Sequence, residues 1–245
     1  MLPFGTYLAA FAQKVLPYKE EKTSEVLQYL KPLPSSTRSL GTSAISVQQV
    51  DEEINHMLSL AYENVEQGFG QLLKYDKKIG EEILKREETV DTLNREIADY
   101  ITNALSMELN NDTSAALSIY YHQITDIERI SDYAVKMENY SKDRLQARLN
   151  EEERDTISSM HSMCMEMYDA RHDIQKSETL RRQSEDVCVN LRKRQMQRMK
   201  EKNISSEISM MFSQLLTDFE RINGHALNIA EDYEIISRCV QLQID

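Results

Sequence analysis

The chain has 245 residues, and its 41 Asp and Glu residues outnumber its 29 Lys and Arg residues, giving a net charge of −12. This acidic balance argues against nucleic acid as a general partner and suits cations or basic surfaces. Glycine (6) and proline (4) are scarce, which is typical of a protein built from long helices. The three cysteines are widely spaced without a C-x-x-C pair, which argues against a zinc site.

Residues 1–44 differ from the rest of the chain. Their apolar stretch at 2–16 is shorter than the ~20 residues that cross a bilayer, and it lacks the preceding positive charge of an export signal. It predicts a short amphipathic helix that either packs on the rest of the protein or lies on a membrane surface. Pro32, Pro34 and the serines after them predict a linker up to residue 44.

Helical periodicity begins at about Ile45 and continues almost to the C-terminus. Asn111 and its neighbours are candidate N-cap residues for the third helix, and Asn150 with Glu153 resembles a capping pattern for the fourth. The predicted helices span about 46–75, 77–109, 113–148, 151–173, 176–201 and 204–241.

An internal repeat organises these helices. The hexapeptides Thr125–Ile130 and Thr217–Ile222 lie 92 positions apart and differ only at Ile127 and Phe219. Each copy falls in the last of three consecutive helices. The sequence therefore predicts an all-α fold of two tandem three-helix bundles, at residues 45–149 and 150–245.

Acidic side chains lie beside the apolar stripes of the second and third helices. Glu87 and Asp91 are four residues apart, as are Glu128 and Asp132, so each pair stacks on one helix face. If these helices pack together, the four carboxylates can face one another. An oxygen-only set of ligands suits hard cations such as Mg²⁺, Mn²⁺ or iron.

Another interpretation of these acids stays open. Arg95, Arg129 and Lys136 lie close enough in sequence to pair with the carboxylates, in which case the chain is a structural helical adaptor without metal. Asp126 lies two residues from Glu128 and so on another helix face, which makes its part in the cluster less direct.

The motifs Glu-Arg-Ile-Ser-Asp-Tyr-Ala at 128–134 and Glu-Arg-Ile-Asn-Gly-His-Ala at 220–226 resemble the signature of the PhoU family. The acidic stretch at 87–97 is similar to the second-helix motif of the same family, and the resemblance covers about residues 45–241. It implies tandem three-helix bundles that bind divalent or trivalent metal ions through E/D-x-x-x-D motifs. It also implies a non-catalytic regulator of phosphate uptake and signalling.

Carried onto this sequence, the resemblance assigns metal-binding roles to Glu87, Asp91, Glu128, Asp132 and Glu220. The second repeat departs from the pattern because Gly224 replaces the counterpart of Asp132. An alignment that matches Glu185 to Glu87 likewise sets Val189 against Asp91. The candidates for a secondary metal site are Asp126, Glu185, Asp218 and His225.

The N-terminal segment resembles the junction before the C-terminal cytoplasmic domain of sodium/phosphate cotransporter-type proteins. This resemblance implies sodium-dependent phosphate transport as the regulated process, with a transporter membrane domain or a phosphate-signalling protein as partner. It places the chain in the cytoplasm, at the inner face of the membrane. Self-association stays open.

Two further patterns favour different functions. Glu53-x-x-His56 and Asp169-x-x-His172 have the ligand spacing of di-iron carboxylate bundles, so an oxidoreductase is the alternative hypothesis. Residues 181–202 hold eight basic and three acidic residues. This basic stretch is either a solvated face that pairs with acidic neighbours or a docking surface for an anionic partner.

Overall fold

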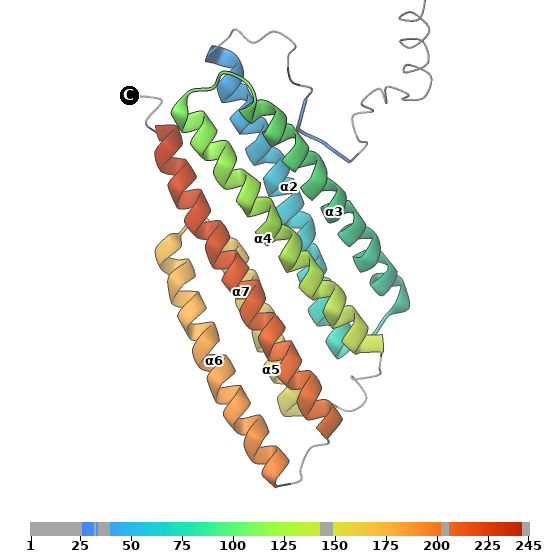
Figure 1. Cartoon of the computed structure of the whole chain (residues 1–245). Helices are drawn as coiled ribbons and strands as arrows, with labels where there is room; N and C mark the ends of the chain where they lie inside the picture. Colours follow the sequence, from blue (N-terminus) through green and yellow to red (C-terminus); the bar gives the residue numbers. More distant parts are fainter. Residues whose placement is uncertain (1–25, 32, 34–39, 143–148, 202–205, 242–245) are drawn as a thin grey trace, which may run out of the picture.

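The computed structural model describes residues 26–31, 33, 40–142, 149–201 and 206–241. These residues form six helices and no strand, which confirms the predicted all-α fold (Figure 1). The helices are α2 (Leu40–Leu73), α3 (Lys77–Leu105), α4 (Asn111–Lys142), α5 (Glu151–Asp169), α6 (Ile174–Lys200) and α7 (Ser206–Gln241). The amphipathic helix predicted within residues 1–25 lies outside the described residues, as does most of the predicted linker.

Side-chain caps set several helix boundaries. Asn150 and Glu153 form the predicted capping box at the start of α5, each bonding the other's backbone N–H at 2.9 Å. At the start of α4 the cap is one residue earlier than expected, because Asn110 Oδ1 accepts from the Thr113 backbone N–H at 2.7 Å. Asp76 and Asp173 accept backbone N–H groups at the starts of α3 and α6.

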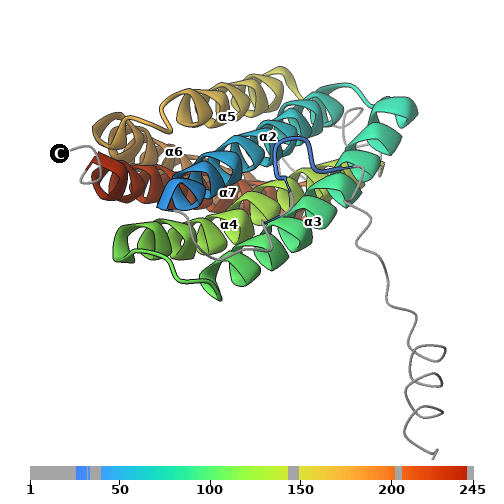
Figure 2. The ribbon, with the colours of Figure 1, turned by 90° about the horizontal axis from the view of Figure 1, so that it is seen from above.

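The helices lie in two layers. In Figure 1, α4 and α7 run side by side in the middle of the front layer, with α3 flanking α4 and α6 flanking α7. The view from above in Figure 2 shows α2 and α5 together as the second layer. Helices α2, α3 and α4 form one half of the molecule and α5, α6 and α7 the other, and the two halves meet through α4 with α7 and α2 with α5.

One hydrophobic core runs through both halves. It contains Ile54 of α2, Ile97 of α3, Ile127 of α4 and Phe219 of α7, all fully buried. Helices α2 and α4 approach closely at Gly68, where an added Cβ would lie 3.3 Å from the Ala134 carbonyl oxygen. The predicted boundary at 149/150 falls between α4 and α5, but a division into two independently folding domains stays a prediction.

The segment 26–31 is attached to α2 by a buried carboxylate. Glu53 accepts the backbone N–H groups of Gln28, Tyr29 and Leu30, at 3.0, 2.7 and 3.0 Å to its Oε2 atom. Buried backbone donors need such a partner because leaving them unpaired costs stability. Among the described helices, none combines the length and apolar character required to cross a membrane.

Candidate functional site

The first half of the molecule brings the four predicted acids into electrostatic contact. Glu87 and Asp91 come from α3, and Glu128 and Asp132 come from the adjacent face of α4. We call these four residues the acidic cluster. Burial raises the pKa of Glu87, and the neighbouring Asp91 and Asp132 raise it further. A carboxylate that is partly buried among other carboxylates is costly to ionise.

The two acids of α4 in the cluster also have raised pKa values. Burial raises the pKa of Glu128, and Asp132 adds to the increase while Arg129 opposes it. The pKa of Asp132 is raised by burial and by Asp91, and Arg129 and Lys136 oppose these effects. Arg129 is only loosely placed between them, at 3.8 Å from Glu128 and 3.6 Å from Asp132. The acidic cluster therefore retains unsatisfied negative charge.

The side chains of this cluster are not drawn together around a single point. Within the described parts of the chain, no group of three or more His, Cys, Asp or Glu side chains is arranged to hold a metal ion. The chemistry of the donors still fits a hard cation, because the cluster offers carboxylate oxygens alone. A cation would also offset the repulsion among the carboxylates, which adds to the effect of burial on these pKa values.

The structure aligns α6 of the second half with α3 of the first half differently from the alignment expected from the sequence. The N-caps of α3 and α6, Asp76 and Asp173, are 97 positions apart. The same offset matches the buried Ile83 to the buried Leu180. This alignment sets Ser184 against Glu87 and Cys188 against Asp91, so the expected match of Glu185 with Glu87 is wrong by one residue.

This register explains why the second repeat lacks an acidic cluster. Three of its four equivalent positions carry no carboxylate, and they are Ser184, Cys188 and Gly224. Burial raises the pKa of the Cys188 thiol to about 12, so this side chain is neutral at physiological pH. Only Glu220 retains the acid.

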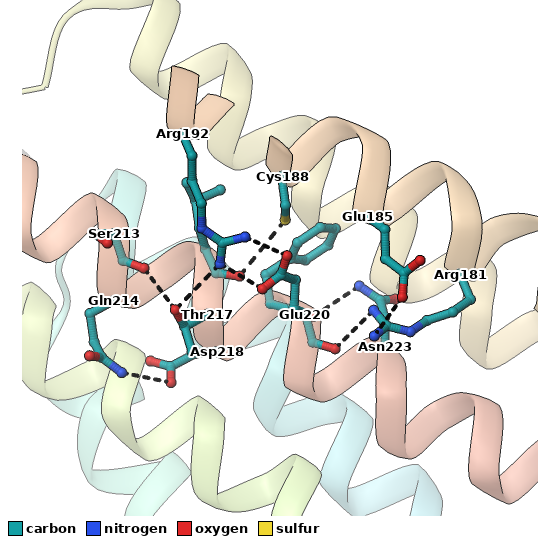
Figure 3. Close-up of polar contacts among 12 residues, drawn as sticks. Arg181, Glu185, Cys188, Arg192, Ser213, Gln214, Thr217, Asp218, Glu220 and Asn223 are labelled. Atoms are coloured by element: carbon teal, nitrogen blue, oxygen red, sulfur yellow. Dashed lines mark hydrogen bonds and ion pairs between the residues drawn. The ribbon is translucent and has the colours of Figure 1, made fainter. Parts of the chain in front are cut away.

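The remaining acid is already paired with an arginine. Arg192 Nη1 and Nη2 donate to the two carboxylate oxygens of Glu220 at 2.6 Å each (Figure 3). These hydrogen bonds lower the pKa of Glu220. The salt-bridge interpretation thus describes Glu220 better than the expected role as a metal ligand.

A second arginine lies where the lost aspartate would stand. Arg181 Nη2 is 4.0 Å from the position that a Cβ of Gly224 would take, and it is 2.9 Å from Glu185 Oε1. Arg181 Nη1 also donates to the Glu220 backbone carbonyl at 3.2 Å (Figure 3). A guanidinium group therefore takes the place that a carboxylate occupies in the first repeat.

The other secondary candidates lie between α4 and α7. The buried Asp218 accepts the Tyr140 hydroxyl at 2.7 Å, and His225 Nδ1 is 2.7 Å from Asp126 Oδ1. Burial, together with Asp126, raises the pKa of Asp232 to about 7. Asp126, Asp218 and His225 thus join the two halves of the molecule, and the structure does not bring them together with Glu185.

Glu53, His56 and His172, which the oxidoreductase hypothesis would use as metal ligands, make other contacts in the structure. The Glu53 carboxylate accepts three backbone N–H groups and pairs with His56 at 3.1 Å. The His172 ring packs on Tyr233 with ring centroids 4.4 Å apart, and burial lowers its pKa. Glu53 and His172 are thus already engaged by other groups, and this does not favour a di-iron centre.

The basic stretch divides into two groups that sequence analysis could not separate. Arg182, Arg194 and Arg198 pair with Glu178, Glu152 and Glu153, as expected for a surface balanced by acidic neighbours. Arg181 and Arg192 pair with Glu185 and Glu220 and also line a groove between α6 and α7. Their 11-residue spacing on α6, three helical turns, is the sequence signal that places them on one face.

This arrangement defines a class of protein, a pair of three-helix bundles joined along their third helices. Residues 54–140, from α2 to α4, match the family model of the PhoU domain. A curated relative, the phosphate-specific transport system accessory protein PhoU homolog 1 of Thermotoga maritima, is 22% identical over 192 residues. That alignment covers 74% of this chain and 82% of the relative.

Solved structures share the fold. The crystal structure of PhoU from Pseudomonas aeruginosa superposes with a TM-score of 0.69 at 18% identity, covering 80% of this chain and 98% of that one. PhoU from Streptococcus pneumoniae gives a TM-score of 0.68 at 16% identity, covering 80% of this chain and 96% of that one. Residues 54–140 therefore carry a PhoU domain, and the chain shares the fold of these two PhoU structures.

Proposed function

We propose that this chain is a non-catalytic regulator of phosphate transport. The support is its PhoU domain and its likeness to a relative named as an accessory protein of a phosphate-specific transport system. The partner in this proposal is the membrane domain of a phosphate transporter or a phosphate-signalling protein, met at the inner face of the membrane. Dependence of that transport on sodium is a finer part of the same proposal.

We further propose that the acidic cluster binds the metal ion on which regulation depends. The observation that carries this step is that α3 and α4 place carboxylates near one another, and that burial first and neighbouring carboxylates second raise the pKa values of Glu87, Glu128 and Asp132. Glu87, Asp91, Glu128 and Asp132 would hold a divalent or trivalent cation such as Mg²⁺, Mn²⁺ or iron. The metal would supply positive charge at the junction of α3 and α4 and so fix the relative positions of these helices.

Elemental analysis tests the metal proposal. Wild-type protein is compared with the Glu128→Gln/Asp132→Asn double variant, which removes two charges at nearly constant shape. The expected result is bound metal in the wild type that the double variant loses. The matched control is Glu178→Gln/Asp186→Asn, which removes two exposed charges from α6 and is expected to keep the metal.

Equal metal content in the wild type and the double variant would overturn the site. Absence of metal from both would favour the structural adaptor, in which Arg129 balances Glu128 and Asp132. The regulatory proposal has its own measurement, which is phosphate uptake by cells with and without the protein. Uptake that responds equally to external phosphate in cells with and without the protein would overturn it.

A further inference from the structure

A groove of about 480 Å³ runs along the second half of the molecule, between α6 and α7. We call it the arginine groove, and its lining residues are Arg181, Arg192, Thr217, Glu220, Arg221, Gly224, His225 and Asn228. Six of the eight come from one face of α7, at the helical spacing that places side chains on a single stripe. Three arginines in one groove are unexpected in a protein with a net charge of −12.

Two of the arginines are held in fixed orientations. Arg192 is held by both oxygens of Glu220, and Arg181 by Glu185 and the Glu220 carbonyl (Figure 3). A guanidinium has five N–H donors, so each keeps donors that these contacts do not use. Fixing the side chains in advance reduces the conformational entropy that a ligand must remove on binding.

The third arginine supplies uncompensated charge. Arg221 is exposed, and no carboxylate among the described residues lies within ion-pair distance of it. The groove therefore holds three guanidinium groups against Glu220 and Glu185. The Asn228 amide and the His225 ring at the same groove add further groups that can donate hydrogen bonds.

Gly224 keeps the centre of the groove open. It occupies the position of Asp132 in the first repeat, and a Cβ there would meet nothing nearer than Arg181 Nη2 at 4.0 Å. A carboxylate at this position would fill the space and neutralise an arginine. The second repeat therefore has the shape and charge for an anion where the first has acids suited to a cation.

We propose that the arginine groove binds a small tetrahedral oxyanion and that its ligand is inorganic phosphate in solution. Guanidinium groups match the geometry of phosphate oxygens and bind them through paired, charge-assisted hydrogen bonds. Phosphate also differs from sulfate in a way that this groove can detect. Hydrogen phosphate carries a P–OH that can donate to a Glu220 oxygen, whereas sulfate has no proton and would meet only repulsion from that carboxylate.

Binding to purified, chelator-treated protein tests the site, because phosphate then cannot be held through a metal in the acidic cluster. Isothermal titration with inorganic phosphate is expected to give one site per chain, with binding at least tenfold weaker in Arg221→Gln. The control is Arg182→Gln, since the neighbouring Arg182 is exposed and pairs with Glu178 outside the groove. Its affinity is expected to equal that of the wild type.

The Glu220→Gln variant tests the selectivity. The amide keeps an oxygen acceptor for the P–OH, removes the negative charge and offers donors to sulfate. Sulfate is therefore expected to bind the wild type at least tenfold more weakly than phosphate, and to approach phosphate in Glu220→Gln. Folding of each variant is verified by its helical circular dichroism.

Three results would overturn the proposal. They are no phosphate binding to the folded wild type, an equal loss of phosphate affinity in Arg221→Gln and Arg182→Gln, and sulfate binding to the wild type as tightly as phosphate.

Vesicles containing phosphatidic acid provide a separate test of the ligand's source. If they bind the protein through Arg221 while free phosphate does not, the ligand is a lipid headgroup and the proposal for phosphate in solution is wrong. The test does not depend on regulation of transport, so either proposal can fail alone.

Discussion

Arg192 donates hydrogen bonds to both carboxylate oxygens of Glu220 at 2.6 Å, and this pair joins α6 to α7. A planar guanidinium makes the two bonds in parallel, which the single ammonium of a lysine cannot do. The pair is partly exposed, so its contribution to stability is modest even though its geometry is specific.

Arg192→Lys is therefore expected to lower the free energy of unfolding by about 0.5–1 kcal/mol at pH 7. Because Arg192 lowers the pKa of Glu220, this contribution is present above the ordinary pKa of 4.5 and is lost as the pH falls through the lowered value. Urea denaturation at pH 7 and pH 3 measures both effects. Arg194→Lys, at the more exposed pair with Glu152, is the control and is expected to change little.

Asp232 provides a test of the opposite sign. Its pKa is raised from 3.8 to about 7 by burial and then by Asp126 and Glu231, so the folded protein retains a proton that the unfolded chain releases. Stability is therefore lost as the pH rises from 4 to 7. Asp232→Asn is expected to melt about 2–4 °C above the wild type at pH 8, with the interaction discounted for partial exposure.

The gain in Asp232→Asn should shrink as the pH is lowered and disappear near pH 3.5, where the wild-type carboxyl is neutral in both states. Thermal melts across this pH range measure it. Asp186→Asn on the exposed face of α6 is the matched control, with no pH-dependent gain expected. A gain that is independent of pH would contradict the assigned cause.

Gly80 allows the buried Glu138 to approach α3. A Cβ at Gly80 would overlap the Glu138 carboxylate, which is buried and paired with Lys142 and so has little room to shift. Gly80→Ala is expected to destabilise the protein by about 1–3 kcal/mol, despite the higher helix propensity of alanine. Urea denaturation should show that Glu138→Ala relieves much of this loss, so the two changes together cost less than their sum.

The control for Gly80 lies on α2. A Cβ at the exposed Gly70 would meet nothing within 4 Å, so Gly70→Ala is expected to stabilise the protein by about 0.5–1 kcal/mol. If Gly80→Ala proved equally stabilising, the close approach of Glu138 would not constrain this position.

Glu53 is expected to hold the segment 26–31 against α2. Glu53→Gln replaces one of two acceptor oxygens with an NH₂ group that faces backbone donors, at a cost of about 1–3 kcal/mol. Limited proteolysis should then cut this segment faster than in the wild type. Glu52→Gln, next in the chain and hydrogen-bonded to the exposed Gln48 side chain, is the control.

Periodicity was sufficient to predict the six helices and to place each pair of acids of the first repeat on one helix face. Glu128 and Asp132 are four residues apart beside a clear apolar stripe, so their common face follows from helix geometry alone. The helix boundaries in the structure differ from the predicted ones by a few residues. Helix α2 starts at Leu40 instead of about Ser46, and α4 ends at Lys142 instead of about residue 148. Ends of helices depend on local caps such as Asn110, which periodicity does not reveal.

Periodicity could not predict the site residues of the second repeat in the same way. Its register depends on the N-cap Asp173, and a shift of one residue exchanged Glu185 and Val189 for Ser184 and Cys188. The arginine groove was hidden for a different reason. Arg181 and Arg192 belong to a stretch whose other arginines form surface pairs, and only the packing of α6 on α7 separates the two groups.

Tyr133 and His225 connect the two unlike surfaces of this molecule. Their rings stack with centroids 6.0 Å apart, and His225 both lines the arginine groove and interacts electrostatically with Glu128. The two proposed ligands, a cation and an anion, therefore occupy sites that share a neighbour. By thermodynamic reciprocity, any factor by which the cation strengthens phosphate binding is the factor by which phosphate must strengthen cation binding. Measuring phosphate affinity with and without the cation would therefore also give the effect of phosphate on cation affinity.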